Sequence, residues 1–256
     1  MVSLRERALR GNKLIGVLVR MPAEELVEMS AVAGMDYVLI DCEHGPDDLI
    51  SLRNHIALAE IHDVPVIVRV GENDPGQILR VLDQGAQGIL APHLDTQADA
   101  EALISAAMYP PLGKRGFATY SRAGRFGATP GAAHRDWYLA NTLVLGMIES
   151  PTGVAAVDEI VQTRRLDGIM IGPADLAATT GPEDQPVAEA TALVNSATVR
   201  ANLVRMDIVG SPAAAAAAFD AGAGMVVYNL THTLMAHLRH LVDASARAVP
   251  AAESQR

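Results

Sequence analysis

The chain has 256 residues, of which 50% are hydrophobic, 4% are aromatic and 20% are charged, with one cysteine. The apolar fraction excludes a mainly disordered protein, and the single cysteine excludes a disulfide framework or a cysteine-rich metal site. The formal net charge of −10 argues against a nucleic-acid partner. The apolar runs are too short to cross a bilayer, and the N-terminus lacks the apolar core of a signal peptide. We therefore expect a cytoplasmic protein with no membrane partner.

Short β-rich runs recur along the chain, separated by segments rich in alanine and leucine with helical spacing. Because these runs are continuously apolar, they are typical of parallel strands covered on both faces. Proline near the start and glycine after the end punctuate several of the helical segments between them. The predicted strands are Leu14–Val19, Tyr37–Ile40, Val66–Val70, Gly88–Ala91, Leu143–Ile148, Gly168–Ile171, Asp207–Val209 and Met225–Tyr228.

This alternation of strands and helices predicts an α/β protein with a (β/α)₈ barrel, formed as a single domain over residues 1–256. A doubly wound open sheet is the competing architecture, but neither of its usual glycine-rich phosphate-binding motifs is present. The stretch Gly113–Gly131 interrupts the rhythm and carries several arginines. We interpret it as a loop that recognises the substrate or contacts another subunit. The last predicted helix, at about 232–248, has an apolar stripe suited to packing on the barrel or on another subunit.

Reactive side chains follow the predicted strands at their carboxyl ends, which is where parallel barrels carry their catalytic groups. Chance can place one or two charges there, but a series over consecutive strands indicates a functional rim. The series comprises Asp41 and His44 after the second strand, Arg69 at the third, His93 after the fourth, Glu149 after the fifth and Asp175 after the sixth.

Glu149 and Asp175 come from adjacent strand ends, and such a carboxylate pair suits Mg²⁺ or Mn²⁺. The alternative is that each acid only caps the helix that follows it. The segment Gly172, Pro173 and Ala174 precedes a helix, so its backbone N–H groups are candidates to hold a substrate carboxylate.

Arg69 closes an otherwise apolar strand and therefore needs an anion as partner. We interpret it as the group that stabilises developing enolate charge, with a structural ion pair as the alternative. His44 lies three residues after Asp41, so a general base oriented by that carboxylate is expected.

Six motifs occur in the same order as in a known family, and the similarity runs from about Ile15 to Tyr228. The sequence resembles the HpcH/HpaI aldolases, which are class II, metal-dependent pyruvate aldolases related to citrate lyase β-subunits and macrophomate synthase. The motifs are Asp41–Pro46, Arg69 with Asn73–Pro75, Asp83–Ala86, Tyr109–Gly116, Ile148–Glu149 and Ile171–Leu176.

The resemblance implies a barrel of the phosphoenolpyruvate/pyruvate-domain type and a role for each residue of the rim. By it, a divalent ion bound by Glu149 and Asp175 chelates the pyruvate fragment, and Arg69 contacts the keto oxygen. Gly172 and Ala174 would hold the substrate carboxylate, and His44 paired with Asp41 would move the hydroxyl proton. Asp83 would be an acid behind the site, often across a subunit interface. The resemblance further implies a homohexamer, a trimer of dimers in which the C-terminal helix is exchanged.

Two positions depart from the family pattern. Met147 stands where a glutamine often precedes the metal-binding glutamate, and methionine cannot hold a metal-bound water in the same way. His93 lies in Pro92-His93-Leu94, where many aldolases have Pro-Met-Val. We therefore count His93 among the residues expected to contact the substrate.

We expect reversible aldol cleavage of a 4-hydroxy-2-oxo acid to an aldehyde and pyruvate or hydroxypyruvate, with Mg²⁺, Mn²⁺ or Co²⁺ as cofactor. Lys13 and Lys114 are the only two lysines, and neither lies in an apolar strand, which disfavours a Schiff-base aldolase. Two alternatives stay open: a related enzyme that decarboxylates oxaloacetate or cleaves acyl-CoA esters, and a non-catalytic barrel that binds a small acid.

Overall fold

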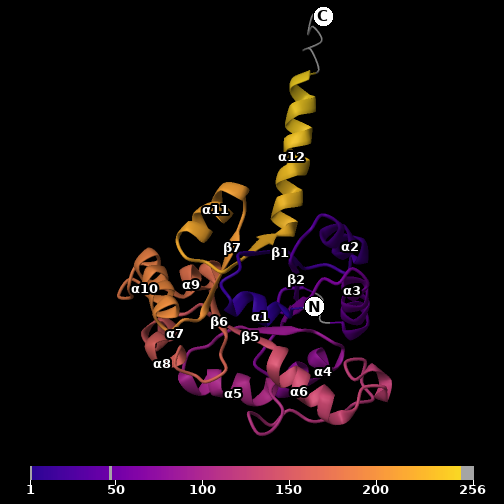
Figure 1. Cartoon of the computed structure of the whole chain (residues 1–256). Helices are drawn as coiled ribbons and strands as arrows, with labels where there is room; N and C mark the ends of the chain where they lie inside the picture. Colours follow the sequence, from indigo (N-terminus) through magenta and orange to yellow (C-terminus); the bar gives the residue numbers. More distant parts are fainter. Residues whose placement is uncertain (1, 46–47, 249–256) are drawn as a thin grey trace, which may run out of the picture.

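A closed barrel of eight parallel strands, arranged in sequence order, forms the centre of the molecule (Figure 1). The computed structural model describes residues 2–45 and 48–248, so Pro46 of the motif after the second strand lies outside the described residues. Neighbouring strands pair in parallel, and β1 closes the barrel against β8 with Gly16 opposite Val227. The predicted (β/α)₈ fold is confirmed.

The strands agree with the predicted runs, with one larger difference at the seventh. β7 begins at Val204 instead of Asp207, because Arg205 breaks the apolar pattern while the strand continues through it. The Arg205 Nε donates to Asp207 Oδ1 at 2.8 Å, so the two charged side chains neutralise each other. The strands are β1 (Leu14–Val19), β2 (Tyr37–Asp41), β3 (Val66–Arg69), β4 (Gly88–Ala91), β5 (Leu143–Ile148), β6 (Gly168–Ile171), β7 (Val204–Val209) and β8 (Met225–Asn229).

The helices begin where the sequence supplies caps. The Asp74 carboxylate accepts from the N–H of Gln77 at 2.7 Å, and Pro75 occupies the first helical position of α4. The helices are α1 (Leu4–Leu9), α2 (Glu24–Val32), α3 (Leu49–Ile61), α4 (Pro75–Asp83), α5 (Gln97–Ala107), α6 (Gly131–Asn141), α7 (Pro151–Ala155), α8 (Val157–Ile160), α9 (Pro173–Thr179), α10 (Val187–Arg200), α11 (Pro212–Asp220) and α12 (Leu230–Ala248), with the 3₁₀ turn η1 (Arg125–Gly127).

Two apolar layers hold the barrel together. The inner layer fills the barrel and includes Leu14, Tyr37 and Ile67, while the outer layer packs the strands against the surrounding helices. Helix α1 lies across one end of the barrel (Figure 1), where Leu4 and Ala8 are buried in the inner layer. The opposite end, at the carboxyl ends of the strands, is therefore the end left open to a ligand.

The arginine-bearing stretch Gly113–Gly131 lies between α5 and β5. Since α5 returns the chain to the amino ends of the strands, this stretch belongs to the end of the barrel that α1 covers. This placement contradicts substrate recognition within the same subunit, and contact with another subunit remains as the prediction. The sequence pattern did not distinguish the two because a long loop has the same composition at either end.

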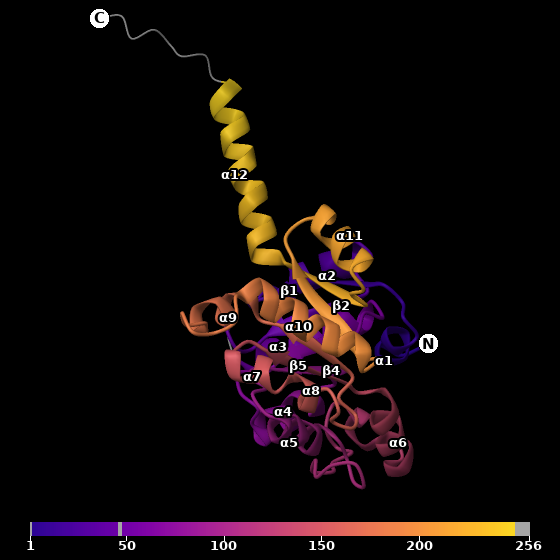
Figure 2. The same ribbon diagram turned by 90° about the vertical axis from the view of Figure 1, so that its left-hand side faces the viewer.

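Helix α12 projects from the barrel instead of packing along it (Figures 1 and 2). Its apolar side chains Leu238, Leu241 and Val242 are 53%, 49% and 67% exposed. The barrel of the same subunit therefore does not cover this apolar stripe. Within the described residues, no helix is both long and apolar enough to cross a membrane.

Candidate active site

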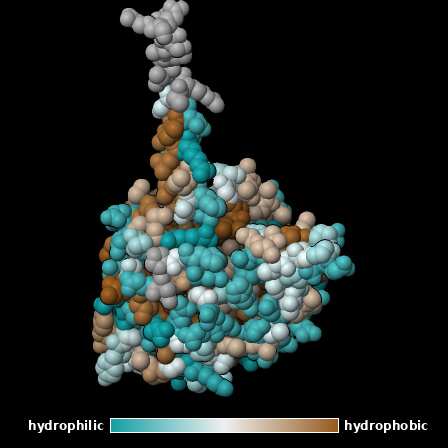
Figure 3. All heavy atoms as spheres, turned by 180° about the vertical axis from the view of Figure 1, so that it is seen from behind, coloured by the Kyte–Doolittle hydropathy of each residue, from teal (hydrophilic) through white to brown (hydrophobic). Residues whose placement is uncertain are grey.

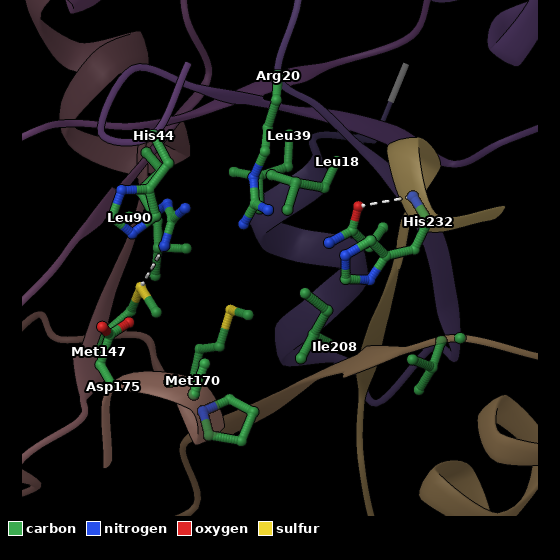
Figure 4. A pocket seen from close by; sticks show the side chains of 17 residues that line it. Leu18, Arg20, Leu39, His44, Leu90, Met147, Met170, Asp175, Ile208 and His232 are labelled. Carbon is green, nitrogen blue, oxygen red and sulfur yellow. Dashed lines mark hydrogen bonds between the residues drawn. The ribbon is translucent and has the colours of Figure 1, made fainter. Parts of the chain in front are cut away.

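A cavity of about 420 Å³ opens at the carboxyl ends of the strands. It is lined by predicted site residues from β2, β3 and β6, namely His44, Arg69, the segment 172–174 and Asp175. Figure 4 shows the His44 imidazole and the Asp175 carboxylate on one side of this cavity, with His232 on the other. Barrel closure thus gathers residues that lie more than a hundred positions apart in the sequence.

Arg69 is fixed at the cavity wall by Asp41. Its Nε donates to Asp41 Oδ1 at 2.8 Å, and Asp41 Oδ2 also accepts from Arg20 Nε at 2.6 Å. Arg69 is 5% exposed and Asp41 only 1%. Burial alone would raise the pKa of Asp41, but the hydrogen bonds and charge of Arg69 hold it below its ordinary value. Asp41 is therefore an ionised anchor that orients two guanidinium groups.

His44 reaches the cavity, although its predicted pairing with Asp41 takes another form. Asp41 Oδ1 accepts from the backbone N–H of His44 at 3.3 Å and makes no contact with the imidazole. The His44 side chain is 50% exposed, and its Nε2 lies 3.9 Å from Glu43 Oε2. The expectation that Asp41 orients the His44 ring is wrong, because both Asp41 oxygens are occupied by arginine and backbone donors.

Glu149 is buried at the end of β5, with 1% of its surface exposed. Its Oε1 accepts from the backbone N–H of His93 at 2.9 Å, and His93 Nδ1 lies 3.1 Å from the same oxygen. Its Oε2 is buried without a hydrogen-bond partner. Gly172 is required beside it, because a Cβ there would lie 2.2 Å from Oε2.

Glu43, His93 and Glu149 form a group whose ligand atoms all lie within 4.8 Å of one another, close enough to share a metal ion. Burial raises the pKa of Glu43, and the charge of Glu149 adds to the rise against the opposing effect of Arg69. His93 contacts these two carboxylates and is not part of the cavity lining. Its predicted contact with substrate stays a prediction.

Asp175 lies at the start of α9 and lines the cavity, but it does not belong to the group of Glu43, His93 and Glu149. No described residue forms a hydrogen bond or ion pair with its carboxylate. The predicted carboxylate-binding segment 172–174 has fewer available backbone N–H groups than expected. The Gly172 N–H already donates to Ile148 O at 3.2 Å, and Pro173 has no N–H. Of these three residues, only Ala174 offers a free N–H to an anion.

Comparison with known proteins decides the family. The model of the HpcH/HpaI aldolase/citrate lyase family matches residues 15–238. The chain belongs to this family. A pyruvate aldolase from Rhizobium etli is 36% identical over 210 residues, which cover 81% of this chain and 80% of the relative. Family membership and this relative make the chain a carbon–carbon lyase.

Further relatives and solved structures agree. A hydroxypyruvate/pyruvate aldolase from Sagittula stellata is 37% identical over 69% of each chain, and a 2-keto-3-deoxy-L-rhamnonate aldolase from Escherichia coli is 34% identical over 70% of this chain and 67% of the relative. The crystal structure of an HpcH/HpaI family protein from Burkholderia cenocepacia superimposes with a TM-score of 0.86 and 28% identity. The superposition covers 96% of this chain and 100% of the Burkholderia cenocepacia protein.

Asp83, predicted to stand behind the site, lies at the other end of the barrel of this HpcH/HpaI enzyme. It is the last residue of α4, and its Oδ1 accepts from Arg115 Nη2 at 2.8 Å. Within one subunit it therefore cannot approach Arg69. A role near the substrate would require a second subunit, as the resemblance implies, and stays a prediction.

Glu43 is the residue of this site to which the sequence pattern assigned no role. The sequence could have indicated its position, because residues two apart on an extended segment point to the same face, as Asp41 and Glu43 do. Asp41 and Glu43 accordingly both reach Arg69, while Cys42 between them is buried in the outer apolar layer.

Proposed function

We propose that this HpcH/HpaI enzyme is a class II aldolase that reversibly cleaves 4-hydroxy-2-oxo acids to an aldehyde and pyruvate or hydroxypyruvate. The names of its relatives as pyruvate, hydroxypyruvate/pyruvate and 2-keto-3-deoxy-L-rhamnonate aldolases support this donor class. The observation that carries the proposal is Arg69, a buried cation held by Asp41 and presented to the cavity that His44 and Asp175 line.

The residues present fit a divalent ion of the Mg²⁺, Mn²⁺ or Co²⁺ kind. The buried Glu149 Oε2 has no hydrogen-bond partner, which is costly for a carboxylate unless a cation shares it. We propose Glu149 and Asp175 as its ligands, in keeping with the family resemblance. When bound there, such an ion supplies Lewis-acid stabilisation of the negative charge that develops on the pyruvate fragment.

The chain's own groups orient that fragment. Arg69 would donate to the keto oxygen, since its carboxylate anchor keeps the guanidinium in one orientation before substrate arrives. The free N–H of Ala174 would donate to the substrate carboxylate. The apolar side chains Leu18, Leu90 and Met170 line the same cavity and limit access of water to these polar contacts.

His44 is the group placed to move the proton. Cleavage of a 4-hydroxy-2-oxo acid removes the proton of the C4 hydroxyl as the C3–C4 bond breaks, and condensation returns it. His44 lines the cavity and is half exposed, so its imidazole can exchange that proton with solvent. The neighbouring Glu43 carboxylate lies 3.9 Å from its Nε2.

The other wall of the cavity would receive the aldehyde. It combines the apolar Ile208 with polar groups from Arg20, Asn229 and His232. Figure 4 shows the Arg20 guanidinium and the His232 imidazole turned toward the cavity, Arg20 from the end of β1 and His232 from α12. A hydroxylated or charged aldehyde suits these donors better than an alkyl aldehyde.

We further propose that the enzyme is a homohexamer, arranged as a trimer of dimers, and that it acts in the cytoplasm. Helix α12 projects from its own barrel and leaves its apolar stripe exposed (Figures 2 and 3). This exposed stripe supports association between subunits. A second copy that covers this stripe would remove from water the side chains that the barrel leaves exposed.

A panel of aldehydes assayed against pyruvate and hydroxypyruvate tests the function. We expect carbon–carbon bond formation with at least one pair, its loss after EDTA treatment, and recovery with Mg²⁺, Mn²⁺ or Co²⁺. Metal-dependent exchange of the pyruvate methyl protons should accompany it. Full activity in chelator would remove the metal from the reaction, and the absence of both condensation and proton exchange would refute the aldolase assignment.

A further inference from the structure

Arg20 and Arg69 both line the cavity, but they differ in how their donors are used. The Nε and Nη2 of Arg69 both donate to Asp41, and its Nη1 lies 2.8 Å from Glu43 Oε2. The Nε of Arg20 donates to Asp41 Oδ2 at 2.6 Å, and its side chain is 27% exposed. Among the residues that the structure describes, none accepts from the two terminal nitrogens of Arg20. These nitrogens are therefore available to a ligand.

The position of Arg20 directs these donors into the cavity. β1 pairs with β8 so that Leu18 lies opposite Asn229, and Arg20 directly follows β1. Residues two apart on an extended strand point to the same face, and Leu18 and Arg20 accordingly both line the cavity. Figure 4 shows the guanidinium of Arg20 turned toward its interior. An anion inside the cavity can therefore reach the terminal nitrogens.

Asn229 supplies a second unused donor at the same wall. It is 5% exposed, and its Oδ1 accepts from the backbone N–H of His232 at 3.3 Å. Only the oxygen of the amide can accept this bond, so Nδ2 is the atom left to face the cavity. No acceptor for Nδ2 is found in the described part of the chain. An arginine and an amide N–H together suit an oxyanion as ligand.

The two arginines lie close together, because one carboxylate accepts from both. Asp41 Oδ1 accepts from Arg69 Nε, and Asp41 Oδ2 accepts from Arg20 Nε. A substrate whose keto oxygen meets Arg69 can therefore extend its other end to Arg20 within the same cavity of about 420 Å³. Since Arg69 is assigned to the keto acid half of the substrate, the end that extends to Arg20 belongs to the aldehyde half.

We propose that Arg20, with Asn229 and His232, binds a carboxylate at the far end of the aldehyde, so that the preferred aldehydes are oxo acids. The proposal rests on the proposed function, and it names the class of aldehyde that this function leaves open. The substrate for cleavage is then a 4-hydroxy-2-oxo dicarboxylic acid. Arginine binds a carboxylate through two parallel N–H···O bonds, which discriminates against a neutral tail of equal size.

Matched aldehydes test this proposal through a ratio. Glyoxylate and 4-oxobutanoate are each assayed with pyruvate beside their methyl esters, which keep the oxo acid skeleton but remove the charge. For at least one of the two pairs, we expect the acid-to-ester ratio of kcat/KM to fall about 30-fold in Arg20→Met relative to the wild type. The loss of a donor to Asp41 affects both members of a pair alike, so this effect cancels in the ratio.

Two further variants give a control and an independent check. Arg200→Met removes an arginine that also pairs with one carboxylate, Asp158, but lies outside the cavity, and it should leave the ratio unchanged. Asn229→Asp keeps an acceptor for the His232 N–H but places a negative charge beside the tail, so the ratio should fall about tenfold. An unchanged ratio in Arg20→Met or in Asn229→Asp would overturn the proposal, and Arg20 would then be only a second anchor of Asp41.

Uncleavable analogues keep this outcome separate from the fate of the proposed function. 2-Oxoglutarate and 2-oxoheptanedioate carry both carboxylates without the C4 hydroxyl, and 2-oxopentanoate and 2-oxoheptanoate lack the terminal carboxylate. In calorimetric titrations with Mg²⁺ present, we expect the wild type to bind one of the diacids about 30-fold more tightly than the monoacid of equal length, and Arg20→Met to lose this preference. The preference in a wild type without aldol activity would refute the proposed function and leave this inference standing. Aldol activity without the preference would refute the inference and leave the function standing.

Discussion

At each of its two ends the barrel carries a buried arginine that forms an ion pair with an aspartate. At the carboxyl ends of the strands, Arg69 Nη2 lies 2.5 Å from Asp41 Oδ2. At the end that α1 covers, Arg115 Nη2 lies 2.8 Å from Asp83 Oδ1. Both guanidinium groups are almost fully buried, so neither the residue types nor the burial of the arginine distinguishes the two pairs. The carboxylates differ slightly, since the Asp83 side chain is 20% exposed and that of Asp41 is fully buried.

The surroundings of the two pairs differ. Arg69 borders a cavity and has Glu43 and Met147 as further neighbours, whereas Arg115 stacks on the rings of Tyr109 at 4.5 Å and Tyr138 at 5.0 Å. Burial raises the pKa of Tyr138 to about 12, so this phenol stays neutral against the cation. One ion pair is therefore open to a ligand and the other is enclosed by aromatic packing.

The largest expected effect is that loss of the arginine impairs catalysis in the Arg69–Asp41 pair but stability in the Arg115–Asp83 pair. Arg69→Met should lower kcat/KM by about 10³-fold, because a preorganised donor to the developing charge is removed. Arg115→Met should leave kcat/KM of the folded protein unchanged but lower stability by about 3 kcal/mol, since Asp83 loses its counter-charge. Kinetics and thermal denaturation of both variants, with a Tm decrease of roughly 6–12 °C expected for Arg115→Met, check this.

The opposite result, in which Arg115→Met impairs catalysis, would contradict this contrast between the two ion pairs. A catalytic loss in Arg115→Met would indicate that Asp83 acts on the site of a second subunit, as the family resemblance implies. Mixing that variant with Arg69→Met would then restore part of the activity, because each would supply the residue that the other lacks.

The next effect concerns the division of labour at the open end. His44→Ala should lower aldol cleavage by about 10²-fold, because the group that moves the hydroxyl proton is absent. Pyruvate binding should be kept, since Arg69 and Asp41 remain in place. Steady-state kinetics and a pyruvate titration measure the two, with His62→Ala, a partly exposed histidine outside the cavity, as control. Equal cleavage by His44→Ala and wild type would remove His44 from the mechanism.

A smaller effect concerns assembly at the same end, because α12 follows β8 directly. Leu238→Glu with Val242→Glu should reduce the size of the oligomer, since both exposed apolar side chains lie on one face of the helix. His240→Glu, placed on the opposite face, is the control and should preserve it. Light scattering after size-exclusion chromatography measures the mass, and an unchanged mass in the double variant would exclude this stripe from the interface.

The fold was predictable because it depends on patterns that the sequence repeats. Continuous apolar runs such as Leu143–Ile148 became strands with the predicted limits, and β7 was shortened in the prediction only because Arg205 is charged. The gathering of Arg69, His44 and Asp175 at one cavity follows from the same rule, since parallel strands end at one edge.

The pairing of side chains within that edge was less predictable. Proximity in sequence suggested that Asp41 orients the His44 ring, but Asp41 instead engages Arg69 and Arg20, which approach from other strands. The place of His93 depends on a left-handed φ that its residue type does not require. Such contacts are set by long-range packing, and a single sequence does not encode them in a local pattern.

The smallest expected effect tests the enclosed end through pH. His134 is 2% exposed, and its Nε2 lies 2.9 Å from the hydroxyl of Tyr109. Burial lowers the pKa of His134, and the charge of Arg115 lowers it further. As the pH falls below about 6.5, the unfolded chain therefore takes up a proton before the folded chain does, and stability decreases until the folded pKa is passed. His134→Gln should flatten this loss between about pH 7 and pH 5, measured by denaturant unfolding, while His62→Gln, at a partly exposed position, should not. An unchanged slope in His134→Gln would mean that the aromatic enclosure admits water, and the contrast between the open and enclosed ion pairs would then rest on the cavity alone.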